Sequence, residues 1–229
     1  DTLNTPETSK LFTRWQNPPN GVESFILTAR PASVQMNFYY VSPSFSNDGR
    51  YLWLRCQFVP PGGYGAQPVL GVVDFELDEM RVYHETQFSN SSPGVDQTTG
   101  DVYWTNGLDL WKRGPLADDA AQRINRFPAD VARGRTTDRI SSHLTFSADR
   151  KSLNIDAQFD NDCYLGDMPL DGSPASVWDK LDGVYNHSQL NPTDPDAILF
   201  ANEYWKWHAP FDGQVKYHRM WLARRGEKA

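Results

Sequence analysis

Hydrophobic and polar positions along this chain form short alternating stretches that come in pairs around tight turns. In four places an apolar residue precedes a polar turn and an apolar run follows it; these residues are Phe45, Val95, Phe146 and Leu190. Alternation with a period of two is typical of β-strands, and clusters of Asn, Asp, Gly, Pro and Ser are typical of the turns between them. The pattern therefore predicts repeated strand–turn–strand units.

The four units recur at a nearly constant spacing. Their apolar residues lie 50, 51 and 44 residues apart along the chain. Self-similarity at roughly 40–50 residues with a strand–turn–strand core is the sequence signature of a β-propeller. We therefore expect an all-β fold in which residues 1–229 form one propeller domain. Because four units fill the chain and propellers have four to eight blades, we expect it to supply about four to five blades, with the remaining blades coming from another segment or chain.

The segment 112–140 departs from the repeat. Its composition predicts a helix over 117–126, and it carries several arginines mixed with aspartates. One interpretation is a salt-bridged surface loop, and the other is an arginine-bearing rim that binds carboxylates. Elsewhere, further strands are expected over residues 24–41, 52–59, 69–77, 80–84, 108–111, 164–170 and 175–181.

Composition and charge narrow the classes of function. The chain is 39% hydrophobic and has no apolar run long enough to span a membrane. Its net charge of −7 excludes a nucleic-acid binder as a whole, so an acidic polymer would need a local basic cluster. The chain opens at Asp1 without Met, as a processed exported protein or a trimmed chain would, and we expect a secreted or periplasmic protein.

The two cysteines form no recognisable metal motif. Cys56 shares the alternation of Leu52 and Leu54, which predicts a buried thiol. Cys163 follows an Asp/Asn-rich stretch. We therefore expect it to lie in a loop, as a metal ligand or a free thiol.

Two histidines occupy the same register of successive repeats. His143 lies three residues before Phe146, and His187 lies three residues before Leu190. In a propeller this strand would line the central channel, and equivalent positions of successive blades come to the same height. We therefore expect the two imidazoles to converge, where they suit proton transfer or metal ligation. The alternative is that each histidine only caps its strand or bonds to the backbone.

Other polar and aromatic residues flank this register. Gln189 lies two residues after His187 and is expected on the same face of the strand. His208 stands beside Trp205 and Trp207, which suggests a sugar-stacking wall, although packing between blades is the alternative. No spaced pair of carboxylates predicts a glycosidase.

The stretch from His187 to Asp196, HSQLNPTDPD, together with Arg219-Met220-Trp221-Leu222, resembles the oligogalacturonate lyase-like propellers. Within that group the chain is similar to the seven-bladed lyases that cut ulvan or the rhamnosyl-glucuronate linkage of related glycans. The resemblance covers roughly residues 40–225. Its Asp-Gly turns are shared with TolB-like propellers, which are not enzymes.

The resemblance implies β-elimination on a uronic acid of an acidic polysaccharide or oligosaccharide. A base removes the proton on C5, an acid protonates the oxygen that leaves C4, and a cationic group neutralises the carboxylate. It assigns His143 and His187 jointly to base and acid, with His208 as a third member and Arg219 as the family's arginine. Gln189, Trp205 and Trp207 are the remaining candidates for binding the substrate.

No cofactor is certain, but a divalent metal, structural or carboxylate-neutralising, is possible in this family. The oligogalacturonate enzymes carry a Cys-His-Glu element where this chain has Ala201-Asn202-Glu203, which favours the rhamnosyl-glucuronate type. Two alternatives stay open: a metal-assisted oligogalacturonate lyase, and a TolB-like propeller that binds glycan or protein without catalysis.

Overall fold

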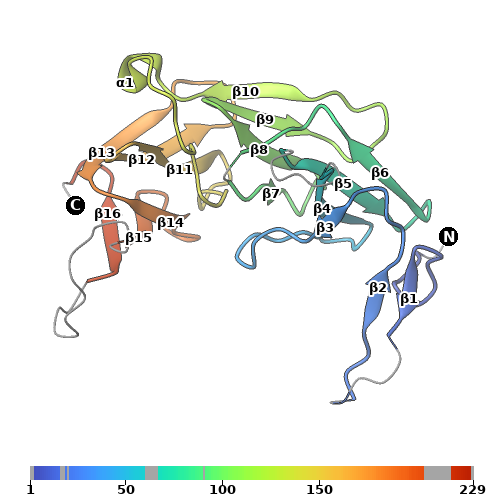
Figure 1. Cartoon of the computed structure of the whole chain (residues 1–229). Helices are drawn as coiled ribbons and strands as arrows, with labels where there is room; N and C mark the ends of the chain where they lie inside the picture. The colour runs from blue at the N-terminus through green and yellow to red at the C-terminus, as the bar shows by residue number, and fades with distance from the viewer. Residues whose placement is uncertain are drawn as a thin grey trace. The chain divides into compact units, whose positions relative to one another are not determined.

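The computed structural model describes residues 3–15, 19, 21–59, 67–89, 91–203 and 218–227. The chain divides into two compact units. The first runs to Gln87 and includes 95–102 and 113–121, and the second contains 88–94, 103–112 and the chain from Gln122 onward. Figure 1 shows that nearly all of the regular structure is β-strand.

The strands are short and follow one another closely along the chain. Their bounds are β1 (Phe12–Arg14), β2 (Phe25–Leu27), β3 (Val34–Met36), β4 (Tyr51–Gln57), β5 (Val69–Asp74), β6 (Glu79–Tyr83), β7 (Gly94–Val95), β8 (Val102–Asn106), β9 (Asp109–Arg113), β10 (Gln122–Arg126), β11 (Ser152–Phe159), β12 (Asp162–Pro169), β13 (Ser176–Asp182), β14 (Tyr185–Leu190), β15 (Ala197–Asn202) and β16 (Met220–Arg224).

Among the described residues, consecutive strands pair into four sheets of the kind that form propeller blades. Their orders are β3-β4-β5-β6, β10-β9-β8-β7, β11-β12-β13 and β14-β15-β16, and β1 pairs separately with β2. Each sheet contains one of the repeats found in the sequence; Phe45 and Phe146, for example, bridge to Leu52 and Leu153 across their turns. The prediction of an all-β propeller with repeated blades is confirmed.

Most of the expected strands are present, and two expectations need correction. The stretch 24–41 is divided into β2 and β3, because Pro31 lies between them and cannot donate to a strand ladder. The helix expected over 117–126 is wrong: β10 lies there and pairs with β9. Ile124 packs against the hydrophobic core, and such burial and pairing outweigh local helix propensity.

The helix of the described part is α1 (Ala129–Ala132). It follows Pro128 and ends at Arg133, whose φ of 53° closes the turn. Among the described residues, no helix is long and apolar enough to cross a membrane.

Several arginines of 112–140 are engaged in ion pairs with aspartates and glutamates. Arg126 lies 3.2 Å from Asp109, and Arg135 lies 2.7 Å from Asp162. Arg113, only 2% exposed, pairs with Glu85. These pairs favour the salt-bridged interpretation of this segment over a carboxylate-binding rim.

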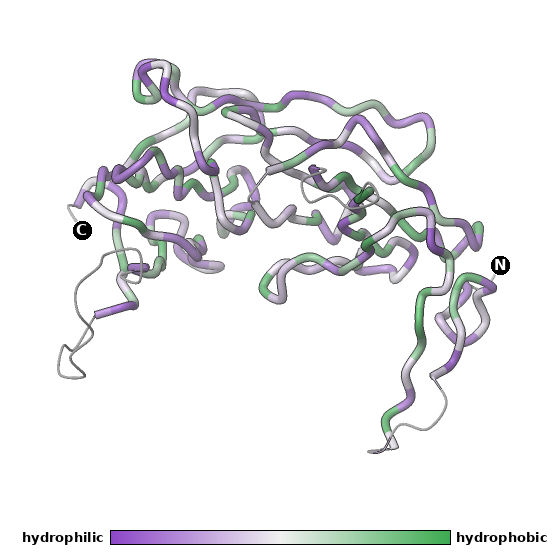
Figure 2. The backbone as a smooth tube through the Cα atoms, viewed as in Figure 1, coloured by the Kyte–Doolittle hydropathy of each residue, from purple (hydrophilic) through white to green (hydrophobic). Residues whose placement is uncertain are grey.

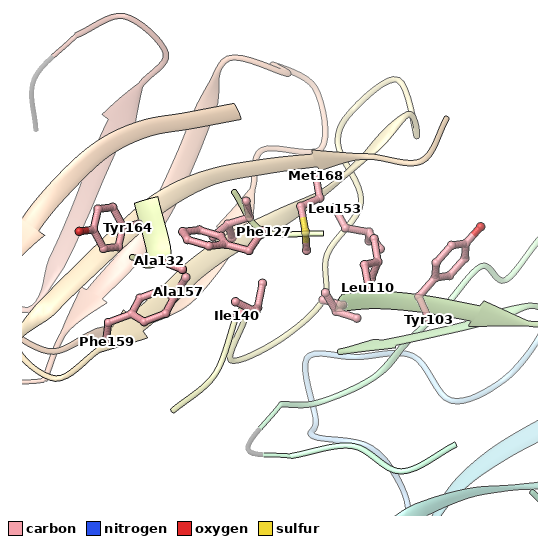
Figure 3. Close-up of a cluster of buried hydrophobic side chains, with 12 residues drawn as sticks. Tyr103, Leu110, Phe127, Ala132, Ile140, Leu153, Ala157, Phe159, Tyr164 and Met168 are labelled. Atoms are coloured by element: carbon pink, nitrogen blue, oxygen red, sulfur yellow. The ribbon is translucent and has the colours of Figure 1, made fainter. Parts of the chain in front are cut away.

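The second unit has its main core around β11 (Figure 3). Phe159 lies 5.3 Å from Phe127 and 5.9 Å from Tyr164 between ring centroids. Burying aromatic side chains of this size stabilises the fold by roughly 1.5–3 kcal/mol each. Figure 2 shows hydrophilic positions interspersed among the hydrophobic ones along the strands.

Both faces of β11 are buried, and one of them is polar. Leu153, Ile155, Ala157 and Phe159 belong to the hydrophobic core. The alternate residues, Asn154, Asp156 and Gln158, are polar and yet fully buried. Because buried polar groups need hydrogen-bond partners, this second face marks a polar network inside the protein.

Both cysteines are buried and free. Cys56 lies in β4, as predicted. Cys163 is not in a loop: it lies in β12 and packs with Leu165, Leu190 and Phe200. Burial raises the pKa of the Cys56 thiol to about 11 and raises that of Cys163 as well.

Candidate functional site

Two histidines from adjacent sheets lie in direct contact. His143 precedes β11, and His187 lies in β14. The distance between His143 Nε2 and His187 Nδ1 is 2.6 Å, and the rings stack with centroids 4.8 Å apart. In such a hydrogen bond one ring nitrogen carries the proton and the other accepts it. The two imidazoles therefore form a pair that shares one proton.

A residue from a third repeat lies beside His143. Ser92 is the residue equivalent to His143 in the preceding repeat, and it forms a parallel bridge with His143. Ser92 N donates to Ser142 O at 2.9 Å, and Leu144 N donates to Ser92 O at 3.2 Å. Equivalent positions of successive repeats thus come together, as the register predicts.

His187 has an unusual backbone conformation. Its φ is 54°, in the left-handed region that residues other than glycine seldom adopt. The pairing of β14 with β15 shifts register between Asn186 and Gln189, so His187 lies within a β-bulge. Bulges re-aim side chains and are frequent beside active sites.

A buried carboxylate supports this bulge. Asp156 of β11 accepts hydrogen bonds from Ser142 N at 2.6 Å, Ser142 Oγ at 2.5 Å and Ser188 N at 3.0 Å. Arg139 Nε lies 3.5 Å from the same carboxylate, and its guanidinium also donates to Tyr185 O. Asp156 is fully buried, so these donors and the cation offset the cost of removing its charge from water.

Asn154 extends the polar network along β11. Its Nδ2 lies 2.6 Å from Ser188 Oγ and 3.0 Å from Ser141 Oγ. Thr145 N donates to Asn154 Oδ1 at 2.7 Å, and Leu190 N donates to Thr145 Oγ1 at 3.0 Å. The segment before β11 and strand β14 are therefore joined by polar side chains at several successive positions.

A second carboxylate lies on the other side of His187. The distance between Glu203 Oε1 and His187 Nε2 is 3.7 Å, and Arg219 donates to the same oxygen at 2.6 Å. The side chain of Glu203 is only 5% exposed, whereas that of Arg219 is 53% exposed. The site thus contains a buried acid next to the histidines and a cation that reaches solvent.

Burial decides the protonation of His143. The residue is 5% exposed, and its pKa falls from 6.5 to about 4, chiefly because burial disfavours the imidazolium and also because His187 is adjacent. Near neutral pH His143 is therefore neutral and offers either a lone pair or an N–H group. An imidazole pair can accept a proton and return one, which is the requirement for acid–base catalysis.

The other predicted residues are only partly placed. Arg219 is adjacent to the histidine pair through Glu203, and Gln189 follows the bulge, where it pairs with Leu199. The alternation of burial continues through the bulge, because His187 and Gln189 are half-buried while Ser188 and Leu190 are buried. Trp205, Trp207 and His208 lie outside the described residues.

Four residues of the site were not candidates from the sequence: Ser142, Asp156, Arg139 and Glu203. The polar positions 154, 156 and 158 in an otherwise apolar strand were the available signal for Asp156. Arg139 was signalled only as one of the arginines of 112–140, and Ser142 and Glu203 gave no signal, because serine and glutamate are common on protein surfaces.

The described side chains do not fit a divalent cation. Within the described ranges, no group of three or more His, Cys, Asp or Glu could hold a metal ion. In the site itself, two imidazole nitrogens are directed at each other and Glu203 is occupied by Arg219. We therefore assign no metal-dependent step to these side chains.

Comparison with protein-family models gave no match, and comparison with curated proteins gave none either. Solved structures do match. An oligogalacturonate lyase in complex with manganese has a TM-score of 0.70 at 16% identity over 93% of this chain and 57% of the lyase. The oligogalacturonate lyase of Vibrio parahaemolyticus has a TM-score of 0.69 at 17% identity over 98% of this chain and 57% of that chain.

A propeller of another kind matches less closely. The β-propeller domain of Cps50 (Swd1) from Myceliophteria thermophila has a TM-score of 0.52 at 10% identity, over 84% of this chain and 60% of that domain. At these identities the matches establish the β-propeller fold. The chain spans a little more than half the length of the two lyases.

Proposed function

We propose that this chain is part of a polysaccharide lyase that cleaves a uronic-acid-containing glycan by β-elimination. The observation that carries the proposal is the hydrogen bond between His143 and His187, 2.6 Å long and made between successive repeats of the propeller. The fold shared with two oligogalacturonate lyases supports the same class of reaction.

The histidine pair supplies the proton transfers that β-elimination needs. The C5–H bond breaks and its proton passes to an imidazole, the electron pair forms the C4–C5 double bond, and the C4–O4 bond breaks. The oxygen that leaves takes a proton from the pair, so the proton balance closes without water. His187 has 31% of its side chain exposed, which makes it the ring that meets the substrate, with His143 behind it.

Arg219 is proposed to bind the uronate carboxylate. Removing a proton next to a carboxylate builds negative charge on it, and a guanidinium can neutralise this charge through a bidentate contact. Arg219 keeps more than half of its side chain exposed while one nitrogen contacts Glu203. Gln189, Trp205, Trp207 and His208 are proposed to complete the substrate site.

We propose a rhamnosyl-1,4-glucuronate linkage, as in ulvan, as the bond that is cleaved. The donor set around His187 favours a cationic side chain over a metal as the neutralising group, because Arg219 contacts Glu203. We further propose that blades from another segment or chain complete the propeller and that the protein is secreted or periplasmic.

The test is the absorbance of the unsaturated uronate. The complete protein is incubated separately with ulvan, a rhamnosyl-glucuronate glycan and oligogalacturonate. We expect absorbance to rise with a glucuronate polymer, at a rate that a chelator does not change. In His187→Ala this rate should fall at least about 100-fold. His84→Gln is the matched control, because His84 packs on Phe58 and should leave the rate unchanged.

Each other outcome has a distinct meaning. A rise only with oligogalacturonate that the chelator abolishes would support metal-assisted cleavage. Binding of a glycan without any rise, with the affinity altered in His187→Ala, would overturn the lyase and leave a binding propeller.

A further inference from the structure

The backbone N–H groups of His187 and Ser188 are both bound from the same side. His187 N donates to Ser142 Oγ at 2.8 Å, and Ser188 N donates to Asp156 Oδ2 at 3.0 Å. In a regular strand successive N–H groups point in opposite directions. The two bonds therefore fix the bulge, and with it the left-handed conformation of His187.

Ser142 and Asp156 act together on the bulge. The Ser142 hydroxyl donates to Asp156 Oδ2 at 2.5 Å, which leaves its lone pairs to accept the N–H of His187. The orientation of this hydroxyl is thus set by the carboxylate. Asp156 is fully buried and Arg139 lies beside it, which strengthens the hydrogen bonds that this carboxylate accepts.

The hydrogen bonds between Ser142 and Asp156 also hold the backbone next to His143. Ser142 immediately precedes His143, and its own N–H group donates to Asp156 Oδ1 at 2.6 Å. One carboxylate therefore fixes the backbone next to both histidines. Because the hydrogen bond between the rings depends on a nitrogen–nitrogen distance of 2.6 Å, a small backbone shift at either residue would break it.

We propose that Ser142 and Asp156 are positioning residues, which hold His187 in its left-handed conformation and so keep its imidazole paired with that of His143. This role rests on the proposed function only for its effect on catalysis. The pairing of the rings is a property of the protein without substrate, and it is measured separately.

The pairing of the rings is measured on the complete protein with three substitutions. Ser142→Ala removes the hydroxyl, and Ser142→Thr retains it. Thr145→Val removes a different hydroxyl, which accepts the N–H of Leu190 and also joins the segment before β11 to β14. The nitrogen chemical shifts of the histidine rings report the pairing. We expect Ser142→Ala to shift the signals of both His143 and His187, and the other two variants to retain the wild-type signals.

Activity gives the second measurement. In Ser142→Ala we expect kcat for the unsaturated product to fall about 100-fold with KM within about twofold, and Ser142→Thr to restore it, because misplacing a catalytic group by about 1 Å costs this much. Asp156→Asn should act like Ser142→Ala, since an amide cannot accept all three donors.

Two results would overturn the positioning role: wild-type histidine signals in Ser142→Ala, or equal shifts in Ser142→Ala and Thr145→Val. If the wild-type protein forms no product from any uronate glycan, the proposed function fails, and the ring signals still decide the positioning role.

Discussion

Burial of His143 should make the stability of this protein fall between pH 7 and pH 5. Its pKa is lowered from 6.5 to about 4 in the folded protein, first by burial and then by His187. Above pH 6.5 neither the folded nor the unfolded state holds the extra proton, so stability is complete there. Below pH 6.5 the unfolded state binds a proton that the folded state does not bind until about pH 4, and stability is lost over this window.

The magnitude follows from the difference in pKa. A shift from 6.5 to about 4 corresponds to a total of about 3 kcal/mol, of which linkage assigns about 2 kcal/mol to the change from pH 7 to pH 5. Carboxyl groups held by ion pairs, such as Asp74 and Asp162, have pKa values lowered from 3.8 and protonate below this window.

The assay is urea unfolding at pH 7 and pH 5 for the wild type, His143→Gln and His84→Gln. We expect the wild type and His84→Gln to lose about 2 kcal/mol more than His143→Gln over this interval. An equal loss in all three proteins would refute the reasoning, because it would mean that burial does not keep His143 neutral.

Two further predictions concern the interior. The thiols of Cys56 and Cys163 should not react with a thiol reagent at pH 8 until the protein is unfolded, since both are buried and their pKa values are raised; rapid labelling of the native protein would contradict this packing. Gly166→Ala should destabilise the protein by about 3 kcal/mol, because an added Cβ would lie 2.0 Å from Ser176 O. Gly107→Ala is the control, with open space around it and a cost near 1 kcal/mol from its φ of 56° alone; equal urea midpoints for the two variants would contradict the steric argument.

The site itself was only partly accessible from sequence. The register of His143 and His187 within the repeats predicted that they would meet, because equivalent positions of successive blades are adjacent. The role of Glu203 beside His187 could not be predicted, since it depends on how β15 ends relative to β14. Arg219 was a candidate only through the family resemblance, and its contact with Glu203 came from the fold.

The sequence by itself determined the class of fold and the repeat. Periodicity of two, turn residues and a spacing of 44–51 residues are local properties, and they reappear as the four sheets. Only the tertiary structure decided three things: that 122–126 is a strand, that Cys163 is buried in β12, and that His187 lies in a bulge held by Ser142 and Asp156. The physical reason is common to all three. Burial and hydrogen bonding to residues distant in the chain outweigh local preference, and these partners are known only once the strands have packed.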